Sequence, residues 1–231
     1  LVVVAIIAIL AAILLPAVHT AVEQGKAVQC LANIRQCSIA AQAYTVDHDG
    51  TYPVAYEYAL NGPTRTTLAW DFTTVAEGGR ISVLPGILWD DGTDMRIQQC
   101  PSFDGDDNWA NEPFTGYNYN TSYVGCPGDP ATADEVGSPE RCALFGDGEY
   151  AGGANKFMRS PFPSPSREDA GFSGRYAGTQ GFRHRGRTNV AFCDGHAASL
   201  EERYTDYAGP AGRVADRTGF LSADNSLYDL E

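Results

Sequence analysis

The sequence predicts an α+β protein in which one long amino-terminal helix packs on a β-rich domain. The first eighteen residues contain no charged side chain, and a helical pattern continues beyond them without a break to about residue 46. The whole chain contains 25 glycines, 13 prolines and 12 tyrosines. This composition is typical of short strands joined by many turns, and it disfavours further long helices.

Residues 1–22 are expected to form the hydrophobic half of the helix, which assembles with other copies or spans a membrane. As a helix, the uncharged segment 1–18 is about 27 Å long, slightly short of the hydrocarbon core of a bilayer. A cleaved signal peptide is the alternative, which the unbroken helical pattern after this segment disfavours. A proline inside the helix removes one backbone hydrogen bond and predicts a kink or local melting near residues 9–16. The residues assigned to this half are Leu1, Val4, Ile7, Leu10, Leu14 and Pro16.

Residues 23–49 are expected to form the amphipathic half of the helix, packed on the head. Apolar residues recur there at alternating spacings of three and four, which is the period of one helical face. Most of them are small, so the head is expected to approach the helix closely. Gly50 is the predicted left-handed stop, and Pro53 prevents the helix from resuming. The head-packing stripe consists of Ala27, Cys30, Ile34, Cys37, Ala41 and Tyr44.

Residues 50–231 are expected to form one globular β-rich head, because about 180 residues suffice for a single core. Segments 141–147 and 189–194 are the clearest strands, and their similar sequences predict that they pair in one antiparallel sheet. The remaining assignments are strands within 66–76 and 81–89, long loops at 101–140 and 150–180, and a polar tail at 205–231.

The acidic balance of the chain bears on its partners. The formal net charge is −13, and only two of the 16 basic residues are lysines. Nucleic acid is therefore not an expected partner, because a face that binds phosphates must be basic. The acidic surface is typical of an exported soluble domain, and it accommodates cations.

The six cysteines favour structural disulfides over a metal–thiolate site. They are even in number in a chain that has the features of an exported protein, and no two of them form a CxxC pair. Cys30 and Cys37 are two turns apart on the helix, roughly 10 Å along its axis, which is too far for a mutual bond. The residues alone leave the other pairings open. The candidates are Cys30, Cys37, Cys100, Cys126, Cys142 and Cys193.

A group of polar residues near the carboxyl-terminal strands has three interpretations. In the first, the Asp194 carboxylate caps backbone amides in a turn, and His184 donates a hydrogen bond that holds two strands together. In the second, the residues bind a metal, with calcium as the best guess because it takes carboxylate ligands. In the third, which is the least favoured, they are catalytic. The expected calcium ligands are Asp147, Glu149 and Asp194, with the acidic loop Asp104-Gly105-Asp106-Asp107 as a second place.

Two motifs at opposite ends of the chain resemble those of type IV pilins and type II secretion pseudopilins. The first is LVVVAIIAILAAILLPAV, followed by a helix and then by YTVDHDGTYP. The second is His184, nine residues, and then Asp194-Gly195, which resembles the mark of one bacterial subgroup. A departure is the missing Phe-Thr-Leu-Ile-Glu-like start, so the glutamate used in assembly cannot be assigned to any residue. The resemblance also implies a Cys30–Cys100 disulfide, since relatives carry a helix cysteine together with a Cys-Pro like Cys100-Pro101.

The resemblance implies a pilin-like fold and a structural role without catalysis or a required cofactor. The implied function is a subunit of an extracellular or periplasmic helical filament, which associates with copies of itself and with other minor pilins. The precursor would reside in the inner membrane before assembly. A pseudopilin of a type II secretion-like machine is the alternative, followed by a membrane-anchored metal-binding or hydrolytic domain.

Overall fold

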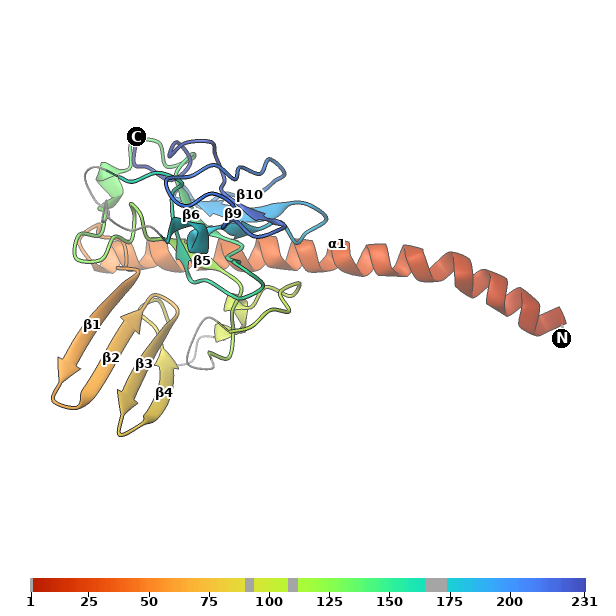
Figure 1. Ribbon diagram of the computed structural model, residues 1–231, viewed down its shortest axis with the longest axis horizontal. Helices are drawn as coiled ribbons and strands as arrows, with labels where there is room; N and C mark the ends of the chain where they lie inside the picture. Colours follow the sequence, from red (N-terminus) through yellow and green to blue (C-terminus); the bar gives the residue numbers. More distant parts are fainter. Residues whose placement is uncertain (1, 90–93, 108–111, 165–173) are drawn as a thin grey trace.

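A computed structural model describes the chain except for residues 1, 90–93, 108–111 and 165–173. Helix α1 (Val2–Asp47) is a rod whose second half lies along the head and whose first half projects from it, as Figure 1 shows. The described part of the head contains mainly antiparallel sheets, with one parallel strand pair, and short 3-10 helices. The α+β class and the single long helix are therefore confirmed. Leu1, assigned to the assembly half, lies outside the described residues.

The second half of α1 buries one face against the head. Cys30, Ile34, Cys37 and Ala41 are fully buried, and Ser38 beside them is buried as well. Two further members of the expected stripe, at positions 27 and 44, are partly buried.

The end of α1 follows the turn chemistry that the sequence predicts. The helix ends at Asp47, and Gly50 adopts a left-handed backbone with φ 82°. The Gly50 amide donates to the Thr45 carbonyl at 2.8 Å, which closes the last turn. A side chain would be strained in this conformation, so glycine suits the position.

Pro16 bends α1 without interrupting it. The helix is continuous through this position, so the local melting expected near residues 9–16 does not occur. The Thr20 hydroxyl donates to the Pro16 carbonyl at 3.0 Å. Figure 1 shows α1 bending within its red amino-terminal part. A bend of this kind relieves the clash of the proline ring at the cost of one hydrogen bond.

A five-stranded sheet forms the centre of the head, in the order β10-β9-β6-β5-β7. Strands β6 and β9 pair antiparallel, as the sequence predicts for segments 141–147 and 189–194. Strands β5 and β7 fall within the two segments expected to be loops, so that expectation is wrong for them. The strands are β5 (Asn118–Asn120), β6 (Ala143–Gly146), β7 (Phe157–Met158), β9 (Thr188–Phe192) and β10 (Ala197–Leu200).

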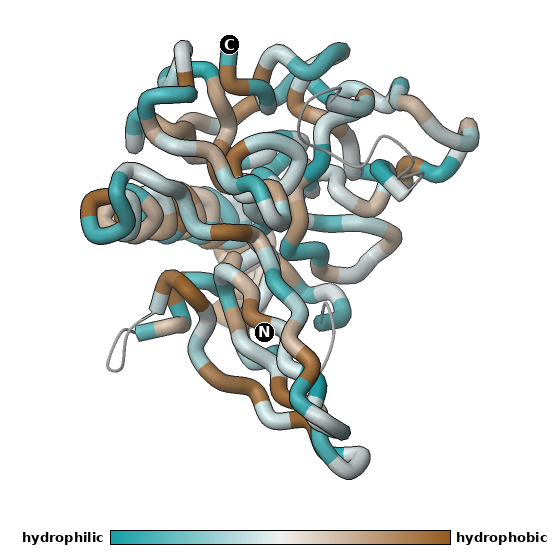
Figure 2. The backbone as a smooth tube through the Cα atoms, turned by 90° about the vertical axis from the view of Figure 1, so that its left-hand side faces the viewer, coloured by the Kyte–Doolittle hydropathy of each residue, from teal (hydrophilic) through white to brown (hydrophobic). Residues whose placement is uncertain are grey.

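A four-stranded antiparallel meander projects from the opposite side of α1, and Figures 1 and 2 agree on this placement. Segment 66–76, expected as one strand region, divides into two strands because Trp70 and Asp71 leave the sheet and are buried. The Trp70 indole donates to the Lys156 carbonyl at 3.0 Å, which links the meander to the segment that precedes β7 of the five-stranded sheet. The strands are β1 (Tyr56–Asn61), β2 (Thr64–Ala69), β3 (Phe72–Glu77) and β4 (Arg80–Pro85).

Two apolar clusters cover the two faces of the five-stranded sheet. The first includes Ile34 of α1, Phe145 of β6 and Ala191 of β9, and the second joins Val190 and Phe192 to residues of the tail. The tail therefore lies on the head, with Phe220, Leu221 and Tyr228 buried. The remaining short elements are β8 (Gln180–Gly181), β11 (Thr218–Gly219) and the 3-10 helices η1 (Met95–Gln98), η2 (Ala133–Glu135) and η3 (Arg175–Gly178).

Truncation of Ile34 tests the contact between helix and head. We expect Ile34→Ala to lower the free energy of unfolding by about 2–5 kcal/mol, because it leaves a cavity at a fully buried position. The matched control is Ile39→Ala on the same helix, where the side chain is 52% exposed and the loss should stay below about 1 kcal/mol. Denaturant unfolding in detergent micelles measures both, and equal losses would show that Ile34 does not hold the head.

Candidate functional site

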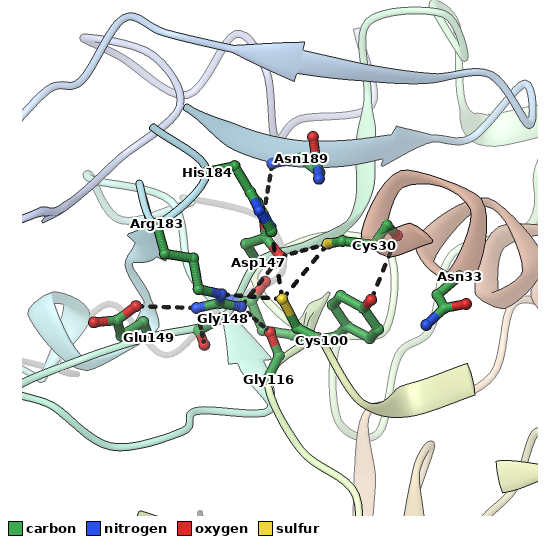
Figure 3. Close-up of polar contacts among 12 residues, drawn as sticks. Cys30, Asn33, Cys100, Gly116, Asp147, Gly148, Glu149, Arg183, His184 and Asn189 are labelled. Atoms are coloured by element: carbon green, nitrogen blue, oxygen red, sulfur yellow. Dashed lines mark hydrogen bonds and ion pairs between the residues drawn. The ribbon is translucent and has the colours of Figure 1, made fainter. Parts of the chain in front are cut away.

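Four side chains from separate parts of the chain converge between α1 and the five-stranded sheet (Figure 3). They are Cys30 of α1, Cys100 after η1, Asp147 directly after β6 and His184 before β9, and we call them the Cys–Asp–His cluster. Three of them are 0% exposed and His184 is 6% exposed. One ligand atom from each lies within 4.8 Å of the others. Among the described residues this is the one such group of three or more metal-ligand side chains.

Strand pairing brings Asp147 into the cluster. Because Gly146 of β6 is paired with Val190 of β9, the residue after β6 lies beside the start of β9. The Asp147 amide donates to the Asn189 carbonyl at 3.1 Å, and the Asn189 amide donates to Asp147 Oδ2 at 2.7 Å. His184 is held in a tight turn by reciprocal backbone hydrogen bonds with Arg187. The Asp147 and His184 side chains therefore meet at the same end of the sheet.

The contacts within the cluster form a closed ring. The Cys30 thiol donates to Asp147 Oδ1 at 3.1 Å, and its Sγ lies 3.6 Å from Cys100 Sγ. His184 Nε2 lies 3.2 Å from Asp147 Oδ2 and 3.6 Å from Cys100 Sγ. His184 Nδ1 is buried with no hydrogen-bond partner among the described atoms. The His184 imidazole therefore contacts the other cluster residues through Nε2.

Arg183 closes the cluster on its outer side, and sequence analysis missed it. Its Nη2 donates to Asp147 Oδ1 at 3.1 Å and to the Gly116 carbonyl, while Nη1 donates to Glu149 Oε2 at 3.0 Å. Its Nε also donates to Cys100 Sγ at 3.2 Å. Asp147 and Glu149 are therefore joined by a guanidinium. The sequence signal that could have revealed Arg183 is its position directly before His184 of the motif.

The electrostatics of the cluster separate the two thiols. Burial and the hydrogen bond with Cys100 raise the pKa of Cys30. Burial opposes ionisation of Cys100, but the hydrogen bond with Cys30 and the Arg183 charge outweigh it and lower the pKa of Cys100 to about 5. The surroundings of the two thiols therefore differ, because they favour ionisation of Cys100 and oppose ionisation of Cys30.

The carboxylate and the imidazole of the cluster stabilise each other's charge. Burial opposes ionisation of Asp147, but the Arg183 charge and the hydrogen bond from His184 hold its pKa below the usual value. Burial also disfavours the imidazolium form of His184, yet its hydrogen bonds to Asp147 and Cys100 raise the pKa to about 9. The contacts with Asp147 and Cys100 therefore favour the protonated form of His184.

The order thiolate, imidazole, carboxylate is also that of a catalytic cysteine, but the burial of the thiol argues against this use. Cys100 is 0% exposed, and a nucleophile must touch its substrate. The arrangement favours a role that needs only the side chains themselves, such as holding segments together or binding an ion.

The expectation of disulfide-tied loops is not met, because all six cysteines are buried thiols. The implied Cys30–Cys100 pair is brought together, but its sulfurs at 3.6 Å are well beyond the bond length of about 2.05 Å. Cys142 directly precedes β6 and Cys193 directly follows β9, and the Cys193 amide donates to the Cys142 carbonyl at 3.0 Å. A hydrogen bond with Cys193 raises the pKa of Cys142. Cys37 of α1 and Cys126 of the head are buried at other positions.

The three carboxylates expected to bind calcium do not form one site. Asp147 follows β6 and Asp194 follows β9, and antiparallel pairing places these two positions at opposite ends of the strands. Asp194 Oδ1 instead accepts from the His196 amide at 3.0 Å and contacts His196 Nδ1 at 2.6 Å. The first interpretation of the sequence is therefore correct for Asp194 as a cap, while the partner of His184 is Asp147.

The backbone conformation at Gly195 explains why the motif has glycine at this position. Its φ is 88°, which a side chain rarely adopts, and an added Cβ would meet the Gln42 amide at 3.0 Å. Gln42 Nε2 donates to the Cys193 carbonyl at 2.8 Å, so this turn contacts α1 directly.

The acidic loop expected as a second place for calcium lies at the surface, unlike the buried Cys–Asp–His cluster. Its carboxylates, Asp104, Asp106 and Asp107, are all exposed.

The first half of α1 is the second candidate functional surface. The expected assembly residues Val4, Ile7, Leu10 and Leu14 are each at least 54% exposed. By length and composition, α1 could cross a membrane, and its most apolar part is not buried in the molecule. Such a helix is suited to act as a membrane anchor or a signal segment.

Comparisons of the chain with protein-family models, curated proteins and solved structures find no match. The fold itself defines the class of architecture: a long apolar amino-terminal helix followed by an antiparallel sheet is a pilin-like arrangement.

Neutralising Asp147 tests whether the cluster stabilises the head. We expect Asp147→Asn to lower the free energy of unfolding by about 3–5 kcal/mol, because it leaves the Arg183 guanidinium buried with too little negative charge. Asp194→Asn is the matched control, since this carboxylate is largely solvated and its loss should cost about 1 kcal/mol or less. Denaturant unfolding at neutral pH compares them, and similar losses would contradict a stabilising cluster.

Proposed function

We propose that the protein is a structural subunit of a helical filament, assembled through the first half of α1. The observation that carries this proposal is the exposure of its apolar side chains. The large apolar residues between Val2 and Val22 are each 51–74% exposed. An apolar surface of this extent needs a partner, because soluble monomers rarely expose patches above a few hundred Å².

The free energy available from this segment supports assembly. A helix of this length offers on the order of 1,000 Å² of apolar surface, which corresponds to roughly 25 kcal/mol when it is fully buried. That exceeds the loss of translational and rotational freedom on association, about 4–15 kcal/mol. Helices bundled in a filament core would therefore hold copies of the chain together, with the acidic heads outside.

The same segment accounts for the state before assembly. A subunit whose first half is uncovered must reside in a membrane until it meets other copies, so the precursor belongs in the inner membrane. The filament would then lie in the periplasm or at the cell surface, and other minor pilins would join it through the same helix.

The uncovered segment equally supports a second candidate, a pseudopilin of a type II secretion-like machine. It shares the architecture and the assembly surface, but assembly would end in a short periplasmic rod. The further alternative, a membrane-anchored metal-binding or hydrolytic domain, has less support as a hydrolase, because both thiols of the Cys–Asp–His cluster are 0% exposed.

Charge in the assembly half tests the proposal. We expect Ile7→Asp to abolish filaments, because an unpaired carboxylate in an apolar bundle costs several kcal/mol per subunit. The matched control is Leu60→Asp on β1, where the native side chain is 78% exposed and lies outside the helix. Negative-stain microscopy and sedimentation compare the variants with the native chain.

The lengths of the native assemblies separate the two candidates. Long fibres of uniform width support a pilus-like filament, and short rods support a pseudopilus. Normal filaments from Ile7→Asp, or filaments lost equally in Leu60→Asp, would overturn assembly through this half of the helix.

A further inference from the structure

We propose that the Cys–Asp–His cluster binds one zinc ion, or a divalent cation of the same thiophilic class, which joins α1 to the head. The role is structural, and it is independent of whether the chain forms filaments. Its four ligand side chains come from four separate segments of the sequence, spread from residue 30 to residue 184. A single ion would therefore link the helix, the loop after η1, the end of β6 and the turn before β9 (Figure 3).

The spacing of the ligand atoms fits a four-coordinate ion. In a tetrahedral zinc site with ordinary bond lengths, neighbouring ligand atoms lie about 3.3–3.8 Å apart. Cys100 Sγ lies 3.6 Å from both Cys30 Sγ and His184 Nε2. The Asp147 carboxylate lies 3.1 Å from Cys30 Sγ through Oδ1 and 3.2 Å from His184 Nε2 through Oδ2, and one ligand atom from each of the four residues lies within 4.8 Å of the others. Small side-chain shifts suffice to place all four around one centre.

The donor types select the class of metal. Two sulfurs, one imidazole nitrogen and one carboxylate oxygen form a set that zinc takes readily, whereas calcium and magnesium require oxygen ligands. The four protein ligands leave no open position in a tetrahedral site, which is the mark of a structural ion rather than a catalytic one.

The charges in the cluster can accommodate the ion. With both thiols and the Asp147 carboxylate ionised, the three ligands carry −3, which the divalent ion and the Arg183 guanidinium balance. Thiol and imidazole ligands bind a metal in their deprotonated forms, so binding of the ion would release protons from the cluster.

The surrounding hydrogen bonds hold the ligands in place. The Arg183 Nε donates to Cys100 Sγ at 3.2 Å, and the Asn189 amide donates to Asp147 Oδ2 at 2.7 Å. The Tyr117 hydroxyl donates to the Cys30 carbonyl at 3.4 Å and fixes that turn of α1. Contacts of this kind orient metal ligands and preserve their geometry.

Metal content and optical spectra of the full-length protein test the proposal. The full chain is purified in detergent without added chelator, and zinc is counted per chain by mass spectrometry. We expect one zinc per chain. After exchange for Co²⁺, we expect a near-ultraviolet thiolate-to-metal band and the visible bands of tetrahedral Co²⁺.

Variants locate the ion. Cys100→Ser and His184→Gln should each weaken zinc binding by more than about tenfold, the loss seen even when residues that only orient ligands are changed. The matched control is Cys37→Ser, which alters another fully buried cysteine of the α1 stripe and should retain full zinc and the Co²⁺ spectrum. Circular dichroism checks that each variant is folded. The metal content and the Co²⁺ spectrum of the native protein test the proposal even where a variant does not fold.

Three results would overturn the proposal. The first is a Cys30–Cys100 disulfide in the native protein, found by non-reducing peptide mapping together with the absence of zinc. The second is a reduced protein that takes up neither Zn²⁺ nor Co²⁺. The third is a loss of binding in Cys37→Ser as large as that in Cys100→Ser.

Discussion

Close packing between the second half of α1 and strands β6 and β9 is the contact on which the rest of the structure depends. It is made largely by small side chains, so the helix approaches the sheet closely enough for polar contacts to form across it. The Ser38 hydroxyl donates to the Phe192 carbonyl at 3.1 Å, and Gln42 donates to the Cys193 carbonyl. The same approach brings Cys30 to Asp147. The head contacts only the second half of α1. The first half therefore has no intramolecular partner among the described residues.

Features set by local periodicity and turn chemistry could be predicted from the sequence. The length of α1 and the stop at Gly50 follow from patterns within a few residues, and the pairing of the two clearest strands follows from the similarity of their sequences. The approach of Cys30 to Cys100 came from the family resemblance, because spacing alone cannot relate positions seventy residues apart.

The features that were missed depend on which distant side chains meet in three dimensions. The expected grouping of Asp147 with Asp194 is incompatible with the antiparallel pairing that the same sequence predicts, since residues following two such strands lie at opposite ends. Following that pairing would have placed Asp147 near the turn of His184. The division of segment 66–76 could not be read from strand propensity, because Trp70 leaves the sheet only to reach a core contributed by distant residues.

A buried polar cluster also explains how a face of small residues can have one register on the head. Alanine, serine and cysteine make a smooth surface, which would tolerate a sliding helix. Moving α1 by one residue rotates its side chains by about 100°, which would take Cys30 away from Asp147. The buried Asp147 carboxylate would then lose the hydrogen bond from the Cys30 thiol, and a hydrogen bond to a charged group contributes about 1.5–3 kcal/mol. Apolar burial therefore supplies the stability of the contact, and the cluster favours the one alignment in which the Cys30 thiol meets the Asp147 carboxylate.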